Sequence, residues 1–404
     1  MHLIILTQYY PPEIGAPQAR LSAIARHFIQ RGHLVTVLTG MPNYPQGKIF
    51  PGYGGFIRRE TYEGVEVIRT FIYPTQKADF FHRLLNYFSF VFSSGILGAI
   101  VLPKADFLLI ESPPLFLGLS GLWLSWKKRV RLIFNVSDLW PESAVRVRVL
   151  EKSSLAYKIS AMLEKSCYEH AWLITGQSKG ILTDIQSRFP DCPTFHLSNG
   201  VDIDMFHPNK KTQEACESLH NDKSDCVVLY AGLHGLAQGL EQAIDAANLL
   251  RKDDSLKFVF IGDGPQKNTL IERAKKYNLS NISFMDPRPA QQIPSLLACA
   301  DIILVMLKMY IPGAVPSKLY EAMASGRPVM LVASGEAAEI VHEYQAGMVV
   351  APGDILGLEN ALQTLSSRPD LRERYGENGR RAATQYFNRT IIVPRFIDYL
   401  EANL

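Results

Sequence analysis

Hydrophobic residues along the chain fall into short runs that alternate with longer amphipathic segments. Near the N-terminus, the apolar run at 2–7 predicts a buried strand, and the spacing of apolar positions in ARLSAIARHFIQRG (19–32) predicts a helix. The apolar run HLVTVLTG (33–40) predicts the next strand. The order strand, helix, strand is the unit from which parallel sheets with helices on both faces are built.

The same order returns about 225 residues later. There, CVVLYAG (226–232) predicts a strand, LHGLAQG (233–239) a loop, LEQAIDAANLLRK (240–252) a helix and LKFVFIGDGP (256–265) another strand. Further strands are predicted at 65–71, 106–111, 131–136 and 172–176, and at 282–286, 301–307, 327–333 and 347–351. We therefore predict an α/β fold with two Rossmann-like domains joined near 198–206. Because ligands bind at the carboxyl ends of parallel strands, we expect the functional site in a cleft between the two sheets.

Composition excludes few function classes. The chain of 404 residues is 47% hydrophobic and 20% charged, which is typical of a globular protein with room for two cores. The net charge of +3 is too small to indicate a nucleic-acid partner. Five cysteines without a Cys-x-x-Cys pair predict free thiols in a reducing compartment. The first residues lead into a strand without a basic segment, so we expect no signal peptide.

Several motifs of other enzyme classes are missing from the sequence. No Gly-x-Gly-x-x-Gly follows the first strand, where the turn reads PPEIGAP (11–17). The absence of this dinucleotide-binding motif argues against a dehydrogenase. Neither a Walker A sequence nor a zinc-binding His or Cys pattern is present. Asp202 and Asp204 match the Asp-x-Asp pattern of some metal sites. They follow Asn-Gly at the expected domain joint, so we interpret them as a turn and predict no metal.

The segment PSKLYEAMASGRPV (316–329) breaks a local rule. Ser317 is a suitable helix N-cap, which would make Lys318 the first helical residue. A cation at this end opposes the helix dipole, and Glu321 lies three residues further on among apolar residues. A bound phosphate would satisfy both the lysine and the N–H groups of the first turn.

Seven motifs in order resemble the retaining glycosyltransferases of family 4, and the resemblance covers nearly the whole chain. They are YYPPEIGAPQAR (9–20), GHLVTVLTG (32–40), DLWPES (138–143), SNGVD (198–202), YAGLHGLAQGL (230–240), IGDGP (261–265) and PSKLYEAMASGRPV (316–329). MPNYP (41–45), DLWPES and HGLAQGL (234–240) are most similar to enzymes that transfer N-acetylfucosamine or related sugars in O-antigen, capsule or colanic-acid synthesis.

This resemblance implies the GT-B fold, in which two Rossmann-like domains have parallel sheets that face a central cleft. It implies an acceptor domain at 1–198 and a donor domain at 199–387, with a C-terminal helix at about 388–404 that packs back on the first domain. It also implies a UDP-sugar donor. Glu321 corresponds to the family glutamate that accepts hydrogen bonds from the ribose hydroxyls, and Lys318 should lie against the diphosphate. Further donor-binding candidates are Gly15, Ala16, Gly232, Ser317 and Leu319.

The sequence departs from the family pattern at the donor sugar. The family usually has a second glutamate at the position of Gly313, where it contacts the sugar. Its absence predicts a deoxy or otherwise altered sugar, or a contact from the backbone of Gly313 and Ala314. The usual Arg and Lys after the first donor-domain strand are also replaced, by Leu233 and Gln238. His234 and Arg288 are therefore candidates for assisting Lys318 at the phosphates.

The resemblance also implies how the sugar is transferred. Retaining enzymes of this family are thought to use no carboxylate nucleophile, because the acceptor attacks on the face that the diphosphate leaves. The protein then stabilises the leaving group and orients the acceptor. Asp138, at a predicted strand end, is the candidate on the acceptor side; the alternative is that it caps a loop. Asn135 stands near the position of a family histidine, and Glu142 is a second choice.

Two apolar stretches raise the question of a membrane. Residues 84–102 carry no charge and are long enough to span a bilayer, but strands predicted on both sides of them belong to one sheet. The stretch 113–126 contains two tryptophans and is followed by Lys127, Lys128, Arg129 and Arg131, which suits an anionic membrane surface. The alternative is two core helices and a solvated turn. Related enzymes use polyprenyl-diphosphate-linked acceptors, so we expect a cytoplasmic protein on the inner face of the cell membrane.

Two other functions stay open. A UDP-sugar 2-epimerase has the same two-domain plan, but it would need more acids and bases in the cleft. A non-catalytic protein that binds UDP-sugar or membrane is also compatible with the missing glutamate at Gly313.

Overall fold

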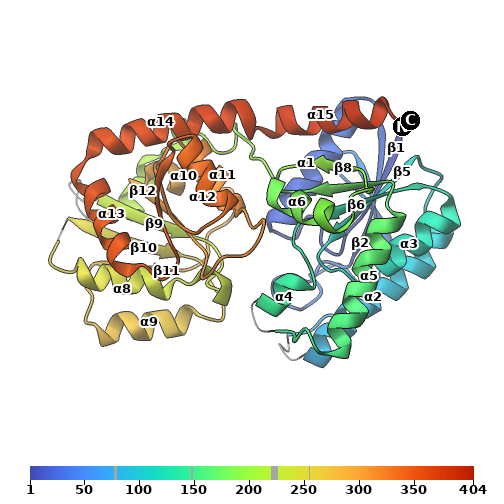
Figure 1. Ribbon diagram of the computed structural model, residues 1–404, viewed down its shortest axis with the longest axis horizontal. Helices are drawn as coiled ribbons and strands as arrows, with labels where there is room; N and C mark the ends of the chain where they lie inside the picture. Colours follow the sequence, from blue (N-terminus) through green and yellow to red (C-terminus); the bar gives the residue numbers. More distant parts are fainter. Residues whose placement is uncertain (77–79, 147–148, 220–225, 254) are drawn as a thin grey trace. The chain divides into compact units, whose positions relative to one another are not determined.

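The computed structural model describes residues 1–404 except 77–79, 147–148, 220–225 and 254, and the chain divides into two compact units. Unit 1 comprises Met1–Asn199 and Ile392–Leu404, and unit 2 comprises Gly200–Ile391. Each unit has one β-sheet with helices on both of its faces (Figure 1). The predicted α/β fold with two parallel-sheet domains is confirmed.

The sheet of unit 1 has eight strands in the order β3-β4-β2-β1-β5-β6-β7-β8. Their bounds are β1 His2–Leu6, β2 Leu34–Gly40, β3 Ile57–Tyr62, β4 Val65–Thr70, β5 Phe107–Ser112, β6 Arg131–Val136, β7 Leu173–Gly176 and β8 Thr194–His196. All neighbours are parallel except β3 and β4, which pair antiparallel. The apolar pattern does not predict β3, which is a polar and largely exposed edge strand, or β8, which has three residues.

The helices of unit 1 cover both faces of this sheet. Their bounds are α1 Ala16–Gln30, α2 Phe80–Val101, α3 Leu117–Lys128, α4 Glu142–Arg146, α5 Leu155–His170, α6 Lys179–Arg188 and α15 Arg389–Glu401. One core joins the sheet to α1 and to α15 from Ile392 on, and the other joins it to α2, α3, α5 and α6.

Helix α2 contains the uncharged stretch that the sequence singles out as a membrane candidate. By length and composition, Phe81–Val101 is the one helical stretch of the described chain that could cross a bilayer, and 33% of its most apolar 18-residue window is buried. The strands before and after it, β4 and β5, lie in the same sheet, as predicted. Because a single crossing would separate these strands, the topology argues against a span.

Unit 2 has a fully parallel sheet in the order β11-β10-β9-β12-β13-β14. The strands are β9 Cys226–Ala231, β10 Leu256–Ile261, β11 Ile282–Met285, β12 Ile302–Met306, β13 Val329–Val332 and β14 Gly347–Val350. The helices are α7 Gln213–Leu219, α8 Glu241–Leu249, α9 Lys267–Lys276, α10 Ile293–Cys299, α11 Ser317–Ala324, α12 Glu336–Glu343, α13 Ile355–Ser367 and α14 Pro369–Tyr386, with 3-10 turns η1 Pro208–Lys210 and η2 Leu236–Gln238. One face is covered by α8, α9 and α13, and the other by α7, α10, α11, α12 and α14.

The prediction that all five cysteines are free thiols is wrong for two of them. Cys216 of α7 and Cys299 of α10 form a disulfide, whereas Cys167, Cys192 and Cys226 are free. The two bonded residues are 83 positions apart, and the packing of α7 on α10 brings their Cα atoms to 5.1 Å. No local spacing in the sequence indicates this approach.

Candidate functional site

The segment that breaks the local rule begins helix α11, after the loop from the carboxyl end of β12. The N-cap position is Pro316, and no side chain caps the first turn. Ser317 is therefore the first helical residue and Lys318 the second, which corrects the predicted N-cap by one position. With no acidic residue in this turn, its N–H groups and the helix dipole favour an anionic ligand.

Lys318 lies against Gly232, the residue that follows β9. A Cβ atom on Gly232 would stand 2.3 Å from Cε and 2.4 Å from Nζ of Lys318, so a side chain here would displace the ammonium group. Gly232 also has a φ of +150°, which favours glycine. At the end of β10, a Cβ on Gly262 would lie 1.9 Å from the carbonyl oxygen of Gly232. The two glycines let the strand ends pack together beneath the lysine.

Glu321 shares a face of α11 with Lys318. The two side chains, three residues apart, line the same small cavity together with Ala231 of β9. Leu319 faces the other way and is fully buried in the core, while its N–H donates to the carbonyl of Pro316 at 3.0 Å. Fold and helix spacing therefore bring Lys318 and Glu321 to the carboxyl end of β9, but Leu319 offers no side chain to a ligand.

The backbone conformation at position 313 explains why a glycine is found there. Gly313 is buried in the loop before α11 with a φ of +68°, a conformation that a glutamate would adopt only with strain. Ala314 follows it and packs partly against the core. The loop is thus built for a residue without a side chain.

His234 does not fit the predicted role as a cation at the phosphates. Its side chain is fully buried among Tyr230, Phe260 and Phe284, with ring centroids 5.9–6.4 Å away. Among the described residues, neither ring nitrogen has a hydrogen-bond partner. Burial, together with the positive charge of Lys267, lowers the pKa of His234 to about 4. A neutral imidazole in this interior cannot supply charge to a phosphate.

The loop that carries Arg288 lies two strands away from β9 in the order of the unit 2 sheet. Arg288 is exposed on this loop after the edge strand β11, and β10 separates that strand from β9.

In unit 1, Gly15 and Ala16 are at the start of α1. Gly15 is the N-cap with extended backbone, and Ala16 is the first helical residue. A Cβ on Gly15 would lie 2.5 Å from Oε1 of Gln18, a buried oxygen without a partner among the described residues. Space around Gln18, rather than backbone angle, therefore favours glycine here.

Asn135 is part of a buried hydrogen-bond network, not a free acceptor-side group. Its Nδ2 donates to Glu111 at 2.6 Å, and its Oδ1 accepts from Thr175 at 2.6 Å. Glu111 also pairs with Arg20, whose side chain is 4% exposed against 2% for the glutamate. Because both ends of the amide are occupied, we correct the prediction that Asn135 meets the acceptor. No local pattern in the sequence indicates the pairing of Arg20 with Glu111, because the two residues lie 91 positions apart.

Asp138 and Glu142 have different environments. Asp138 follows β6 and is half-buried; its Oδ2 accepts a hydrogen bond from Ser143 at 2.9 Å, and burial raises its pKa. Burial alone would also raise the pKa of Glu142, but a hydrogen bond from Tyr157 and the charge of Lys152 lower it overall. Glu142 is therefore occupied by neighbours, which leaves Asp138 as the stronger candidate.

Unit 1 has a pocket of about 230 Å³ that no motif in the sequence indicates. Its lining includes the rings of Tyr9, Tyr44 and Tyr87, with Asn43 and Arg83 among the polar groups. It follows the carboxyl ends of β1 and β2, the edge at which parallel sheets bind ligands.

A buried carboxylate shapes the wall of this pocket. Glu13 accepts hydrogen bonds from the backbone N–H groups of Tyr10, Asn43 and Tyr44 at 2.8–3.2 Å. Burial raises the pKa of Glu13 to about 7, and the three hydrogen bonds oppose this shift. The sequence feature that marks this buried carboxylate is its position directly after two prolines, in PPEIGAP.

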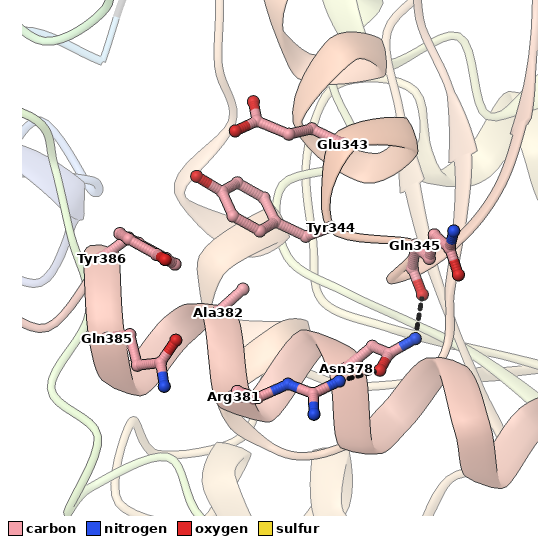
Figure 2. Close-up of a pocket in the computed structure, with 8 residues that line it drawn as sticks. All are labelled: Glu343, Tyr344, Gln345, Asn378, Arg381, Ala382, Gln385 and Tyr386. Carbon is pink, nitrogen blue, oxygen red and sulfur yellow. Dashed lines mark hydrogen bonds between the residues drawn. The ribbon is translucent and has the colours of Figure 1, made fainter.

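Unit 2 also has a polar pocket of about 290 Å³ between the end of α12 and α14 (Figure 2). Tyr344 and Tyr386 face each other there with ring centroids 5.3 Å apart, and Asn378 donates to the carbonyl of Gln345. This pocket lies at the amino end of β14. In a parallel sheet, that edge is opposite the carboxyl ends that carry Gly232 and α11, so the two sites are separate.

The predicted turn at Asp202 is confirmed. Its Oδ1 accepts from the backbone N–H groups of Asp204 and Met205 at 3.1 and 2.9 Å. Over the part of the chain that the structure describes, no group of three or more His, Cys, Asp or Glu residues is placed to hold a metal ion.

Comparison with known proteins agrees with this architecture. Residues 15–200 match the family of glycosyl transferase 4-like domains, and residues 211–382 match the glycosyl transferases group 1. The putative colanic acid biosynthesis glycosyl transferase WcaI of Escherichia coli (strain K12) is 25% identical over 340 residues, which are 82% of this chain and 83% of the relative. The probable glycosyltransferase WbjE of Pseudomonas aeruginosa is 25% identical over 65% of this chain and 66% of its own.

Solved structures show the same fold. Anabaena Alr3699/HepE in complex with UDP superposes with a TM-score of 0.75 at 18% identity, with full coverage of both chains. Sucrose-phosphate synthase from Thermosynechococcus elongatus gives 0.76, also at 18% identity, and covers 100% of this chain and 99% of its own. With both halves matched in the expected order, the chain belongs to the family 4 glycosyltransferases of the GT-B type.

Proposed function

We propose that this protein is a retaining glycosyltransferase that moves a sugar from a UDP-sugar to a polyprenyl-diphosphate-linked saccharide. The sugar is an N-acetylated 6-deoxyhexose, and the product enters a surface polysaccharide such as O-antigen or capsule. The enzyme works in the cytoplasm at the inner face of the cell membrane. The single observation that carries the proposal is the placement of Lys318 and Glu321 beside Gly232, at the carboxyl edge of the unit 2 sheet.

Donor binding follows from this placement. The uncapped first turn of α11 and the Lys318 ammonium group attract the diphosphate, with the Ser317 hydroxyl as a further donor. The Glu321 carboxylate accepts hydrogen bonds from the ribose hydroxyls. HepE, which has the same fold, was solved with UDP and with UDP-glucose, which supports a uridine nucleotide donor here. Backbone at Gly313 and Ala314 meets the sugar, and the lack of a carboxylate there suits a sugar with fewer hydroxyl groups.

In the transfer step, the acceptor hydroxyl forms a bond to the anomeric carbon on the face that the UDP oxygen leaves. The proton of the hydroxyl passes to an oxygen of the departing diphosphate, so no carboxylate nucleophile is needed. Negative charge grows on the diphosphate as its bond to the sugar breaks, and Lys318 stabilises that charge. Asp138 orients the acceptor hydroxyl, and the tyrosine-lined pocket of unit 1 holds an acceptor sugar.

Replacing Glu321 with Ala should raise the dissociation constant for UDP about tenfold or more, because hydrogen bonds to a charged group contribute roughly 1.5–3 kcal/mol. Isothermal titration calorimetry measures this effect. Glu339→Ala, which changes a glutamate in the first turn of α12, is the control and should leave UDP affinity unchanged. A folded Glu321→Ala variant with wild-type affinity would contradict the ribose contact.

Asp138→Asn should lower turnover about tenfold or more while leaving UDP affinity unchanged, since one positioning group for the acceptor is lost. The amide oxygen can still accept the hydrogen bond from Ser143. Because burial raises the pKa of Asp138 in the folded protein, this group makes the wild type less stable as the pH rises above about 4, the usual value for an aspartate. The variant lacks that titration, so its free energy of unfolding should fall less over the same range. Unchanged turnover with this altered pH dependence would mean that Asp138 only caps a loop.

The proposed activity is tested by incubating the protein with UDP-sugars, including N-acetylated 6-deoxy sugars, and measuring the products. A transferase slowly releases UDP from its own donor even without acceptor, and retains the anomeric configuration when acceptor is present. Interconversion of two UDP-sugars would instead identify an epimerase. Absence of both reactions with every donor that raises the melting temperature would identify a non-catalytic binding protein.

A further inference from the structure

Helix α2 has a stripe of large apolar side chains on its outer face. Phe81, Leu85, Phe92, Ile96 and Ile100 are 41–74% exposed, and their spacing places them on one side of the helix. The opposite side of α2 packs on the unit 1 sheet. Burying these side chains in water-free surroundings would be favourable, so the stripe has the properties of a contact surface.

Helix α3 extends this stripe sideways. Leu119, Trp123 and Trp126 are 44–70% exposed and recur at intervals of four and three residues. Trp123 donates its indole N–H to the carbonyl of Gly95 in α2 at 3.2 Å, and α2 and α3 pack against each other along their length (Figure 1). We refer to the eight exposed side chains of the two helices as the α2–α3 apolar surface.

The two helices themselves carry charge of one sign. The sequence contains no Asp or Glu at 80–105 or at 113–131, which together include both helices. Arg83 is exposed near the start of α2, and Lys104, Lys127 and Arg129 are exposed near the ends of the two helices.

The basic cluster predicted at 127–131 is smaller than its sequence indicates. The Lys128 ammonium group donates to the carbonyl of Leu102 at 2.7 Å. Arg131 donates to the carbonyls of Asn403 and Leu404 at the C-terminus. These two cations tie parts of unit 1 together, although Arg131 stays exposed to solvent, so we take Lys127 and Arg129 as the exposed charges of the cluster that are available to a ligand.

We propose that the α2–α3 apolar surface inserts into the headgroup region of an anionic lipid bilayer, with the exposed cations against lipid phosphates. An apolar face rich in Trp and Phe, free of acids and flanked by Lys and Arg, has the composition of a helix that lies in a membrane interface. A second copy of the chain would bring the same exposed cations against each other, which disfavours a dimer at this face. The proposal rests on the membrane location in the proposed function and deepens it: insertion of apolar side chains, rather than charge alone, holds the protein.

The test is flotation of the full-length protein with vesicles of phosphatidylcholine and phosphatidylglycerol. Phe92→Gln/Ile96→Gln/Ile100→Gln should lower the partition coefficient about tenfold or more, because apolar insertion is lost. The matched control, Leu249→Gln/Leu356→Gln, removes exposed apolar side chains from unit 2 and should bind like the wild type. Lys127→Gln/Arg129→Gln should weaken binding several-fold at low salt, and wild-type binding should persist in part at high salt.

Tryptophan fluorescence locates the contact. Lipids brominated on their acyl chains should quench Trp123 and Trp126, and the quenching should disappear in Trp123→Phe/Trp126→Phe. Trp172→Phe is the control, because Trp172 packs against Phe107 and Tyr399 on the other core of unit 1, and it should leave the quenching intact.

Three results would overturn this inference: vesicle binding by the triple variant equal to that of the control, no quenching, or a wild-type dimer in sedimentation velocity that the triple variant lacks. The last result would identify the surface as a contact between copies of the chain. UDP affinity and UDP release, measured on the same variants, report on unit 2. If UDP affinity and UDP release are normal in these variants, a negative result for membrane insertion does not contradict the proposed transfer reaction.

Discussion

Replacing Lys318 with Met lowers turnover by about two orders of magnitude or more, which is the usual effect of removing one preorganised group that stabilises transition-state charge. Met keeps the apolar stem beside Gly232 and removes the ammonium group. The nucleotide-free protein should not lose stability, and it should gain a few tenths of a kcal/mol, because the cation opposes the dipole at the start of α11. UMP affinity should fall less than UDP affinity, since we propose that the second phosphate lies against the lysine.

Turnover, melting temperature and both nucleotide affinities are measured on the same preparation. The control is Lys276→Met, which removes an exposed lysine at the end of α9 and should change none of them. Loss of stability without ligand, combined with unchanged turnover, would show that Lys318 is a structural lysine and that the diphosphate binds elsewhere.

Arg20→Met lowers the free energy of unfolding of unit 1 by about 3–5 kcal/mol, because it leaves the Glu111 carboxylate buried without its cation. Asn135 and Ser137 still donate to that carboxylate, but two neutral donors do not balance a buried negative charge. Urea denaturation, followed by tryptophan fluorescence, measures the loss, and the signal reports on unit 1 because all four tryptophans lie there.

The matched control lies on the same helix. Arg26 pairs with Glu63 at 3.1 Å, but the two side chains are 44% and 46% exposed, so Arg26→Met should cost no more than about 1 kcal/mol. The double variant Arg20→Met/Glu111→Leu should recover part of the loss, because it removes the unpaired charge as well. Equal costs for Arg20→Met and Arg26→Met would contradict the role assigned to the buried pair.

The sequence pattern is clearest for the central strands, whose side chains are buried on both faces. β1, β5, β9 and β12 are continuous apolar runs, and such runs are typical of central strands in parallel sheets. β3 is missed because it is an edge strand with arginine, glutamate and threonine in its six residues. Its position depends on antiparallel pairing with β4, which the local pattern does not encode.

The candidate site residues show the same difference between what depends on local spacing and what depends on distant segments. The placement of Lys318 and Glu321 on one face of α11 can be predicted from the sequence, because both belong to one helical turn; their roles toward a donor stay predictions. His234, Asn135 and Glu142 are assigned too much chemistry, since their roles depend on neighbours from other segments: aromatic rings around His234, Glu111 and Thr175 around Asn135, and Tyr157 and Lys152 around Glu142.

By itself, the sequence determines the two strand–helix–strand halves, the parallel sheets and the conflict at the start of α11, because these depend on periodicity and on residues within one turn. Only the tertiary structure decides which polar side chains stay available. Burial turns His234 neutral, a distant arginine occupies Glu111, and packing of α2 on α3 joins two apolar stripes into one surface. The physical reason is that charge, solvation and exposed area depend on every group within a few ångströms, and most of those groups come from distant parts of the chain.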